Sequence, residues 1–289
     1  MDDVRGKVVL VTGASSGIGR ATAMGLARRG SPLLLTGRDP ARCDEALAAV
    51  RAAGATDARM FRTDFGSLGA VRKLADDIGG QARQIDVVIN NAGVTAFRRT
   101  LSADGHELTF AVNHLAPFLL TGLLLPLLRP GARIVNVASD AHRRDALDFD
   151  DLHNARNYRG LRVYGQSKTA NILWSLELAR RLDGSGVTAN SLHPGVIRSN
   201  MGRGNGFGWD LLQRFAGLFM KSPERGAATS IYLAESPAVE GVSGRYFADC
   251  REKQPAAHAV DPQTAERLWE VSEELVGFRY DFSGRPPSP

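Results

Sequence analysis

Short apolar runs of the length of a β-strand recur along this chain and alternate with longer amphipathic stretches. The runs are apolar on both faces, as strands buried between two layers of helices are. They occupy residues 7–12, 32–36, 57–63, 85–89, 133–138, 187–193 and 245–249. Helix-type stretches lie between most of them, for example residues 41–53, 67–78 and 169–182. This alternation predicts an α/β fold, a doubly wound parallel sheet of about seven strands with helices on both faces.

The size of the chain fits one folded domain. Its 289 residues can bury a substantial core, and 43% hydrophobic with 23% charged residues is ordinary for a globular protein. We therefore predict a single domain over residues 1–281. Residues 282–289, which end in Gly-Arg-Pro-Pro-Ser-Pro, are predicted to form a flexible tail.

Charge and cysteine content narrow the class of partner. The net charge of +5 is spread without a basic run, which disfavours a nucleic-acid partner. Cys43 and Cys250 are the two cysteines, too few for a disulfide framework, and no metal-ligand spacing is present. We find no signal segment and no uninterrupted apolar stretch long enough to span a membrane, so we expect a metal-free cytoplasmic protein without a stable membrane anchor.

Two long segments interrupt the regular alternation. Residues 140–161 are polar, and residues 199–222 begin Gly-rich and become apolar. Both follow predicted strand ends, where open α/β sheets bind ligands, so we predict a substrate lid over residues 200–222. The apolar part, residues 209–220, fits an apolar substrate wall and equally a helix on the core or at a subunit contact, which leaves a homo-oligomer open. His142 fits either a substrate contact or a solvated loop position.

A glycine-rich turn follows the first predicted strand. Glycines at 13, 17 and 19 let the backbone turn tightly and approach a pyrophosphate, and the helix start beyond them offers free N–H groups. This pattern predicts a dinucleotide site, with a plain turn and helix packing as the alternative. The spacing is not that of a Walker loop, which disfavours nucleoside triphosphate hydrolysis. The predicted contacts are Thr12, Gly13, Ser15, Ser16, Gly17, Ile18 and Gly19.

The end of the second predicted strand bears on the choice of cofactor. An NAD enzyme usually places a carboxylate there for the ribose 2′-hydroxyl. Here Gly37 clears space and Arg38 can bind a 2′-phosphate bidentately, which favours NADP(H). Asp39 followed by Pro40 fits a helix N-cap and first helical position better than a ribose ligand. A solvated surface position is the alternative for Arg38.

Six motifs in the chain share the order and approximate spacing of one family. They are residues 12–19, Asn90-Asn91-Ala92-Gly93, Asn113, Ser139, Tyr164-Gly165-Gln166-Ser167-Lys168 and Pro194-Gly195. Together they resemble the short-chain dehydrogenases/reductases over most of the chain. The resemblance implies a single Rossmann-like domain that moves a hydride between a nicotinamide and a carbonyl or alcohol carbon.

The chemistry explains these residue types. Tyr164 and Lys168 are four positions apart and share one face of a helix. A phenol with a pKa of about 10 is a weak acid–base catalyst near neutrality, but an ammonium and an oxidised nicotinamide beside it would stabilise the phenolate. Ser139, at the end of the fifth predicted strand, would hydrogen-bond the substrate oxygen. Taken singly, each also fits an ordinary structural position.

Further roles are implied by the resemblance alone. Lys168 would also hold the nicotinamide ribose, and Asn113 would hold a water that links Lys168 to solvent. Asp64 would bind the adenine amino group, with a helix cap as its alternative, and Asn90 would tie the central strands together. Ile197 and Ser199 would contact the nicotinamide carboxamide. The remaining predicted cofactor contacts are Phe65, Asn91, Ala92, Gly93, Tyr164, Pro194 and Gly195.

The spacing between two motifs narrows the branch of the family. Ser139 and Tyr164 are 25 positions apart, which with the sequences around Asn113, Lys168 and Gly195 is similar to the retinol-dehydrogenase-like branch. That resemblance implies an apolar aldehyde, ketone or alcohol as substrate. C=C reduction, epimerisation or dehydration on the same fold remains an alternative, as does a non-catalytic NADP-binding regulator. The four catalytic residue types are all present, which weighs against the regulator.

Overall fold

One mixed sheet forms the centre of the molecule. The computed structural model describes residues 6–195 and 222–282. In this part the strands lie in the order β3-β2-β1-β4-β5-β6-β7-β8, and every pairing up to β7 is parallel. They are β1 (Val9–Val11), β2 (Leu33–Gly37), β3 (Ala58–Arg62), β4 (Ile85–Asn90), β5 (Leu128–Val137), β6 (Thr188–His193), β7 (Tyr246–Ala248) and β8 (Arg251–Glu252).

Each of the seven predicted apolar runs contains or overlaps one of the strands from β1 to β7, which confirms the predicted fold class. The eighth strand, β8, was not predicted. It has two residues and pairs antiparallel with β7, so it is too short to show a periodicity in the sequence.

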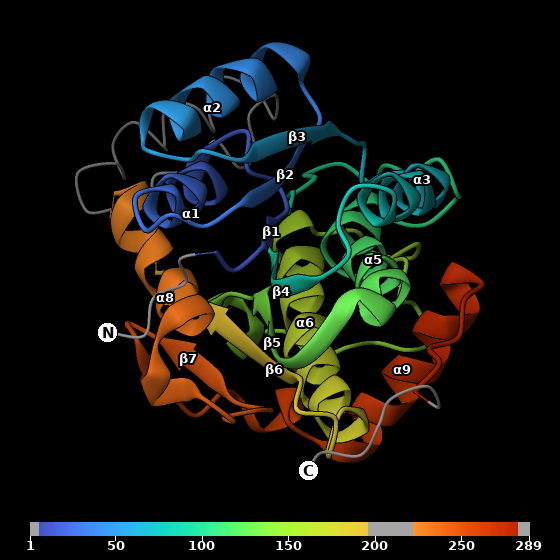
Figure 1. Ribbon diagram of the computed structural model, residues 1–289. Coiled ribbons are helices and arrows are strands. Elements are labelled where there is room, and N and C mark those ends of the chain that lie inside the picture. Colours follow the sequence, from blue (N-terminus) through green and yellow to red (C-terminus); the bar gives the residue numbers. More distant parts are fainter. Residues whose placement is uncertain (1–5, 196–221, 283–289) are drawn as a thin grey trace.

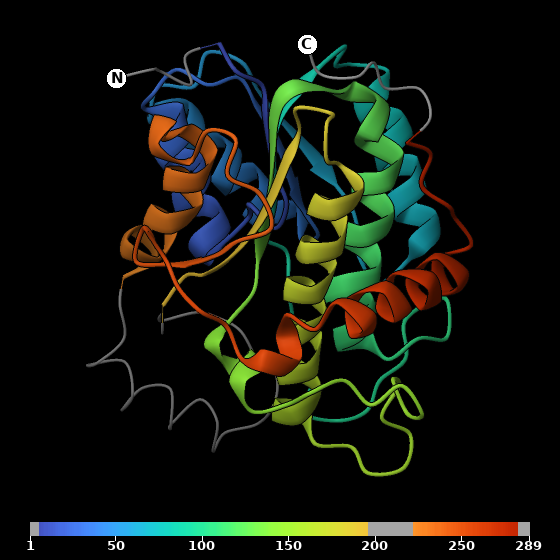
Figure 2. The same ribbon diagram turned by 90° about the horizontal axis from the view of Figure 1, so that it is seen from below.

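Helices cover both faces of the sheet (Figures 1 and 2). One face carries α1 (Gly17–Ala27), α2 (Pro40–Ala52) and α8 (Pro223–Glu235). The other carries α3 (Leu68–Gly79), α5 (Ala116–Leu124) and α6 (Gly160–Arg181), and α9 (Pro262–Val276) packs on α6. The layers are those of a doubly wound α/β fold.

Alternate residues of one strand enter two separate cores. Leu10 packs with α3, α5 and α6, whereas its neighbours Val9 and Val11 pack with α1 and α8. All three side chains are completely buried. A strand with helices on both faces must be apolar at every position, which is why these runs show no polar alternation.

One helical run of twenty residues in the core is unusually apolar. Residues Leu108–Leu127 are continuous in helix, and by length and composition alone this run could cross a membrane. Asn113 and His114 interrupt this run, so it does not conflict with the expectation that the chain holds no uninterrupted apolar stretch of that length. Because 89% of its most apolar window is buried inside the protein, packing in the core accounts for its apolar composition. Within it, η1 (Ala111–Leu115) is a π-helical turn.

The first interruption of the alternation is irregular, as predicted. It begins with a short 3-10 turn, η3 (Asp140–Arg143), and α6 starts at Gly160. Residues 200–221 of the predicted lid and residues 283–289 of the predicted tail lie outside the described residues. Phe282, the first residue of that tail, stacks on Tyr280 with ring centroids 5.7 Å apart.

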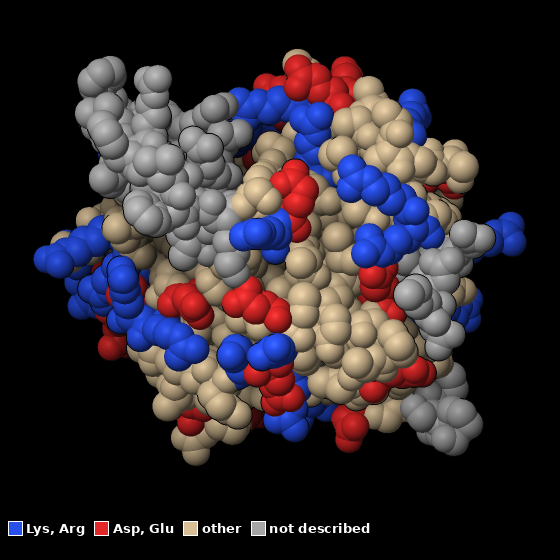
Figure 3. All heavy atoms as spheres, turned by 90° about the vertical axis from the view of Figure 1, so that its left-hand side faces the viewer, with Lys and Arg blue, Asp and Glu red and all other residues tan. Residues whose placement is uncertain are grey.

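Basic and acidic side chains are interspersed over the described part of the face seen in Figure 3. This surface pattern matches the even spread of charge along the sequence.

Candidate active site

The glycine turn after β1 lies against the end of β4. Gly13 has φ +66°, and a Cβ there would stand 2.8 Å from the Ala92 Cα. A Cβ on Gly19 would collide with the Asn91 amide and the Gly13 carbonyl. Only glycine permits this approach, because both obstacles include backbone atoms.

Thr12 and Asn91 hold the turn in place by reciprocal hydrogen bonds. The Thr12 Oγ1 accepts from the backbone N–H groups of Asn91 at 2.9 Å and Ala92 at 3.0 Å. The Asn91 side-chain amide donates to the Thr12 carbonyl at 2.8 Å. These two predicted cofactor residues therefore also build the loop on which the other contacts depend.

The start of α1 fits a phosphate group. Within the described residues, the N-cap Ser16 makes no side-chain capping bond, and the first turn of α1 holds no acidic residue. A Cβ on Gly17 would meet no described atom within 4 Å, so the space above the turn is open. Free N–H groups and the positive end of the helix dipole at such an opening are what a dinucleotide phosphate needs.

The residues after β2 partly correct the sequence interpretation. Asp39 accepts a 2.9 Å hydrogen bond from the Arg42 N–H as the N-cap of α2, with Pro40 at the first position, as predicted. Gly37 does not clear space for a phosphate, because a Cβ there would meet the Cys43 Sγ at 2.5 Å and the Ser15 Cβ at 2.8 Å. Glycine is needed there for packing. Arg38 is exposed and has no hydrogen bond or ion pair to the described part of the chain.

Asp64 and Phe65 follow β3 at the same edge of the sheet. Asp64 is exposed, and its Oδ1 accepts from the Gly66 N–H at 2.9 Å. The alternative of a helix cap is wrong, since Ser67 caps α3. The Phe65 side chain is buried in the core, so only its backbone can face a cofactor.

Tyr164, Lys168 and Ser139 come together between β5 and α6. The Ser139 side chain lies beside the Tyr164 phenol. The Lys168 Nζ lies 5.6 Å from the centroid of the Tyr164 ring and donates to the Val137 carbonyl at 2.9 Å. A Cβ on Gly93 would stand 3.6 Å from the same Nζ. The end of β4 therefore faces the predicted catalytic residues directly.

Burial shifts the pKa values of Tyr164 and Lys168 in opposite directions. Burial raises the pKa of Tyr164, and the hydrogen bond from Ser139 opposes that rise. Burial also lowers the pKa of Lys168 to about 8. Desolvation disfavours the charged form of both side chains, and the acidic phenol expected beside an ammonium and an oxidised nicotinamide stays a prediction.

This burial predicts an unusual pH dependence of stability for Lys168. Its folded pKa of about 8 lies below the ordinary value of 10.5, so between these values the unfolded chain holds more protons and wild-type stability rises with pH. Lys168→Met should stabilise the fold below pH 8, by at most about 3 kcal/mol at 1.36 kcal/mol per pKa unit. The gain should shrink towards pH 10.5 in urea unfolding series.

The matched control is Lys73→Met, because Lys73 is an exposed lysine that pairs with Asp77 on α3. A stability difference for Lys168→Met that stays constant from pH 7 to pH 10.5 would contradict the assignment.

Asn113 lies in the middle of the π-turn η1, a feature common at functional sites. Its Oδ1 accepts from the Val94 N–H at 2.7 Å, and its Nδ2 donates to the Val94 carbonyl at 3.0 Å and the Ser167 Oγ at 2.9 Å. These bonds tie the segment after β4 to α6. The implied water-holding role stays a prediction.

Asn90 is structural, as interpreted from the sequence. Its Nδ2 donates to the Thr121 Oγ1 at 3.0 Å and the Asn136 Oδ1 at 2.8 Å, which joins β4 to β5 and α5. Pro194 and Gly195 follow β6 at the same edge of the sheet, with Gly195 at φ +91°. Ile197 and Ser199 lie outside the described residues.

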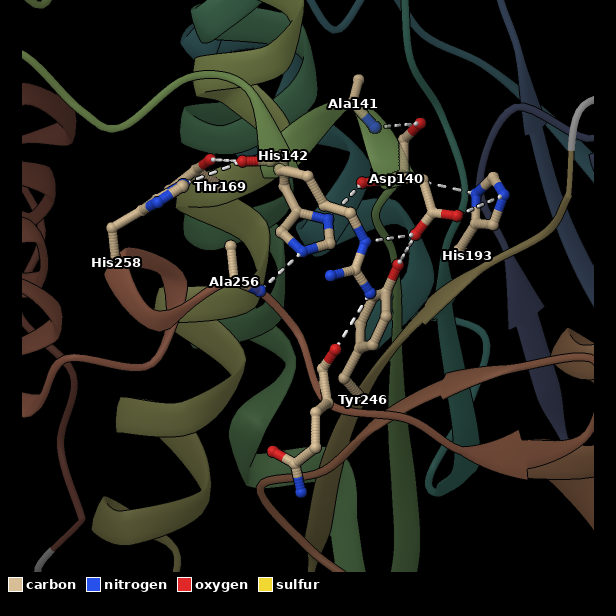
Figure 4. Close-up of polar contacts among 11 residues, drawn as sticks. Asp140, Ala141, His142, Thr169, His193, Tyr246, Ala256 and His258 are labelled. Carbon is tan, nitrogen blue, oxygen red and sulfur yellow. Dashed lines mark hydrogen bonds and ion pairs between the residues drawn. The ribbon is translucent and has the colours of Figure 1, made fainter.

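A polar network beside Ser139 was missed by the sequence analysis (Figure 4). His142 is completely buried, so both of its interpretations as an accessible loop residue are wrong. Its ring contacts the Ser139 carbonyl and the Ala256 N–H. Asp140 accepts from the Tyr246 hydroxyl at 2.9 Å. Ala256 and Tyr246 lie more than a hundred positions from the residues that they contact, so no local pattern could have indicated these two contacts.

Comparison with known proteins identifies the family. Residues 7–206 match the family described as short chain dehydrogenase. This chain belongs to the short-chain dehydrogenase family. It is therefore an oxidoreductase of a family that binds a nicotinamide cofactor.

Several known proteins resemble this short-chain dehydrogenase closely. Retinol dehydrogenase 14 of Mus musculus is 45% identical, over 95% of this chain and 87% of that protein. A solved structure from Mycobacterium paratuberculosis, an uncharacterised protein, has a TM-score of 0.80 at 30% identity and covers 98% of this chain and 97% of its own. A short chain dehydrogenase from Burkholderia cenocepacia in complex with NADP has a TM-score of 0.68 at 28% identity, over 85% of this chain and 97% of its own.

Proposed function

We propose that this protein reduces the carbonyl group of an apolar aldehyde or ketone with NADPH, and oxidises the corresponding alcohol in reverse. The observation that carries the proposal is that the Ser139 side chain lies beside the Tyr164 phenol, with the Lys168 Nζ 5.6 Å from the centroid of the phenol ring. The pair lies at the strand ends beside the glycine turn, so one ligand oxygen can contact both hydroxyls. Such a pair is suited to an oxygen that gains charge and then a proton.

The chain supplies the proton and the charge stabilisation. A bound NADPH supplies the hydride. Ser139 donates a hydrogen bond to the carbonyl oxygen, and Tyr164 gives that oxygen its proton. Because burial raises the pKa of Tyr164, the phenol is protonated near neutral pH, which is the form that reduction needs. The Lys168 ammonium then stabilises the phenolate that remains.

Three features support NADP(H) over NAD(H). Arg38 projects from the end of β2 without a partner in the described chain, so its guanidinium is available for a 2′-phosphate. The carboxylate of Asp39 is engaged as the cap of α2. The Burkholderia relative was solved with NADP.

An apolar substrate is supported by the relatives and by the sequence. The similar mouse protein is named for retinol, an apolar alcohol. The predicted lid, residues 200–222, contains Trp209, Leu211, Leu212, Phe215, Leu218 and Phe219. We propose the cytoplasm as the site of the reaction.

A substrate screen tests the proposal. Purified protein is incubated with NADPH or NADH and a panel of apolar ketones, aldehydes and enones, and the products are identified. We expect alcohols from the ketones or aldehydes, formed faster with NADPH. Saturated ketones from the enones, with the carbonyl intact, would show C=C reduction instead. NADPH binding without any product would point to a non-catalytic protein.

A further inference from the structure

The peptide group between Ser139 and Asp140 is hydrogen-bonded to two imidazole rings, one on each side. The Ser139 carbonyl accepts from the His142 Nδ1 at 2.6 Å, and the Asp140 N–H donates to the His193 Nδ1 at 3.2 Å. Figure 4 shows the His142 and His193 rings on opposite sides of this turn. The orientation of the Ser139 backbone, and with it the direction of its hydroxyl, therefore depends on these rings.

The hydrogen bonds of His142 determine its tautomer. The Ala256 N–H is 3.1 Å from the His142 Nε2 and can only donate, so Nε2 must carry the lone pair. Nδ1 then carries the hydrogen that is donated to the Ser139 carbonyl. The ring is fully buried and packs edge-on against Tyr246 at 5.2 Å. It has no room to rotate without losing both bonds.

The backbone of His142 is also anchored. Its carbonyl accepts from the His258 Nε2 at 2.8 Å and from the Thr169 Oγ1 at 3.3 Å. Thr169 follows Lys168 on α6, and His258 belongs to the turn η5 (Ala257–Ala259). The turn η3, the helix α6 and the turn η5 therefore meet at His142.

We propose that His142 is a positioning residue for the reaction, which holds the Ser139 peptide so that the Ser139 hydroxyl faces Tyr164. This inference rests on the proposed function for its kinetic consequence and on the proximity of Ser139 to Tyr164 for its structural one. His142 acts only through Ser139, because its ring is buried and both of its nitrogens are bonded within the chain. The segment around Ala256 thereby contributes to the geometry of the active site.

Two substitutions separate the two bonds of the ring. In His142→Asn the side-chain amide stands near the position of Nδ1 and can still donate to the Ser139 carbonyl. In His142→Gln the amide reaches the position of Nε2 and can accept from Ala256. The side-chain donor to the Ser139 carbonyl is lost, and only the backbone N–H of residue 142 still donates to it, at 3.1 Å. We expect His142→Gln to lower kcat about 10-fold or more at unchanged NADPH affinity, and His142→Asn to stay within about threefold.

A second readout does not require turnover. The hydrogen bond from Ser139 lowers the pKa of Tyr164, so a misplaced Ser139 hydroxyl should move the phenolate titration to higher pH. The titration of Tyr164 is isolated by subtracting the ultraviolet titration of the same protein with Tyr164→Phe. We expect a shift to higher pH in His142→Gln and little shift in His142→Asn. The two kinds of failure are distinguishable, because a wild-type protein without carbonyl turnover defeats the proposed function while this titration still decides the role of His142.

A third variant tests the proposal without replacing His142, so it does not depend on the folding of the first two variants. Ala256 has φ −66°, which suits proline, so Ala256→Pro removes the N–H that fixes the His142 tautomer and leaves the His142 side chain in place. We expect a decrease in kcat and a rise in the Tyr164 titration, both smaller than in His142→Gln. Wild-type kcat and an unshifted Tyr164 titration in both variants would overturn the proposal.

Discussion

Tyr164→Phe is expected to lower kcat for carbonyl reduction by about 10²- to 10⁴-fold, the usual contribution of a general acid. The substitution removes one hydroxyl and keeps the ring under the Lys168 ammonium, so the packing of α6 should not change. NADPH affinity should remain within about twofold, since the glycine turn and Arg38 are untouched. Steady-state kinetics and NADPH fluorescence titration measure the two quantities.

The matched control is Tyr232→Phe, the same change on α8, where the ring packs beside Phe247. It should leave both quantities at the wild-type level. Unchanged turnover in Tyr164→Phe would remove this phenol from the mechanism. A loss of NADPH binding in the same variant would mean that the hydroxyl holds the cofactor and does not act as the acid.

Arg38→Ala is expected to weaken NADPH binding by about 10- to 100-fold, because hydrogen bonds to a charged group contribute about 1.5–3 kcal/mol. NADH lacks the 2′-phosphate, so its affinity should change less than about threefold. Arg38 has no partner in the described chain, and stability should therefore not fall. Isothermal titration with both cofactors gives the comparison.

Arg28→Ala, at the opposite end of α1, is the control for the loss of one surface cation. Equal losses of NADPH and NADH affinity in Arg38→Ala would defeat the phosphate assignment. Higher salt should weaken NADPH binding to the wild type more than to the variant, because screening acts on the removed charge.

The fold follows closely from the sequence because its signal is local. Val9, Leu10 and Val11 are apolar since each faces one of two helix layers, and the same reason applies to the other central strands. The cap of α2 by Asp39 was equally predictable, because the capping residue and its proline are neighbours in sequence. Strand β8 and the π-turn η1 were not, since each depends on surrounding packing.

The residues of the candidate site were predicted more fully than their pKa values and packing. Tyr164, Lys168, Ser139 and the glycine turn gather at one edge of the sheet, as their motifs indicate. The rise of the Tyr164 pKa on burial was not predicted, because desolvation depends on the whole fold. Gly37 was predicted to leave space for a phosphate, whereas the side chains of Cys43 and Ser15 occupy that space. The role of His142 depends on Ala256, 114 positions later.

The most direct test of the account is isotope transfer from NADPH deuterated at C4 of the nicotinamide, with an apolar ketone that the protein turns over. The account predicts one deuterium on the carbinol carbon of the product, with the hydroxyl proton derived from water. An alcohol without deuterium, from NADPH labelled on either face, would contradict it.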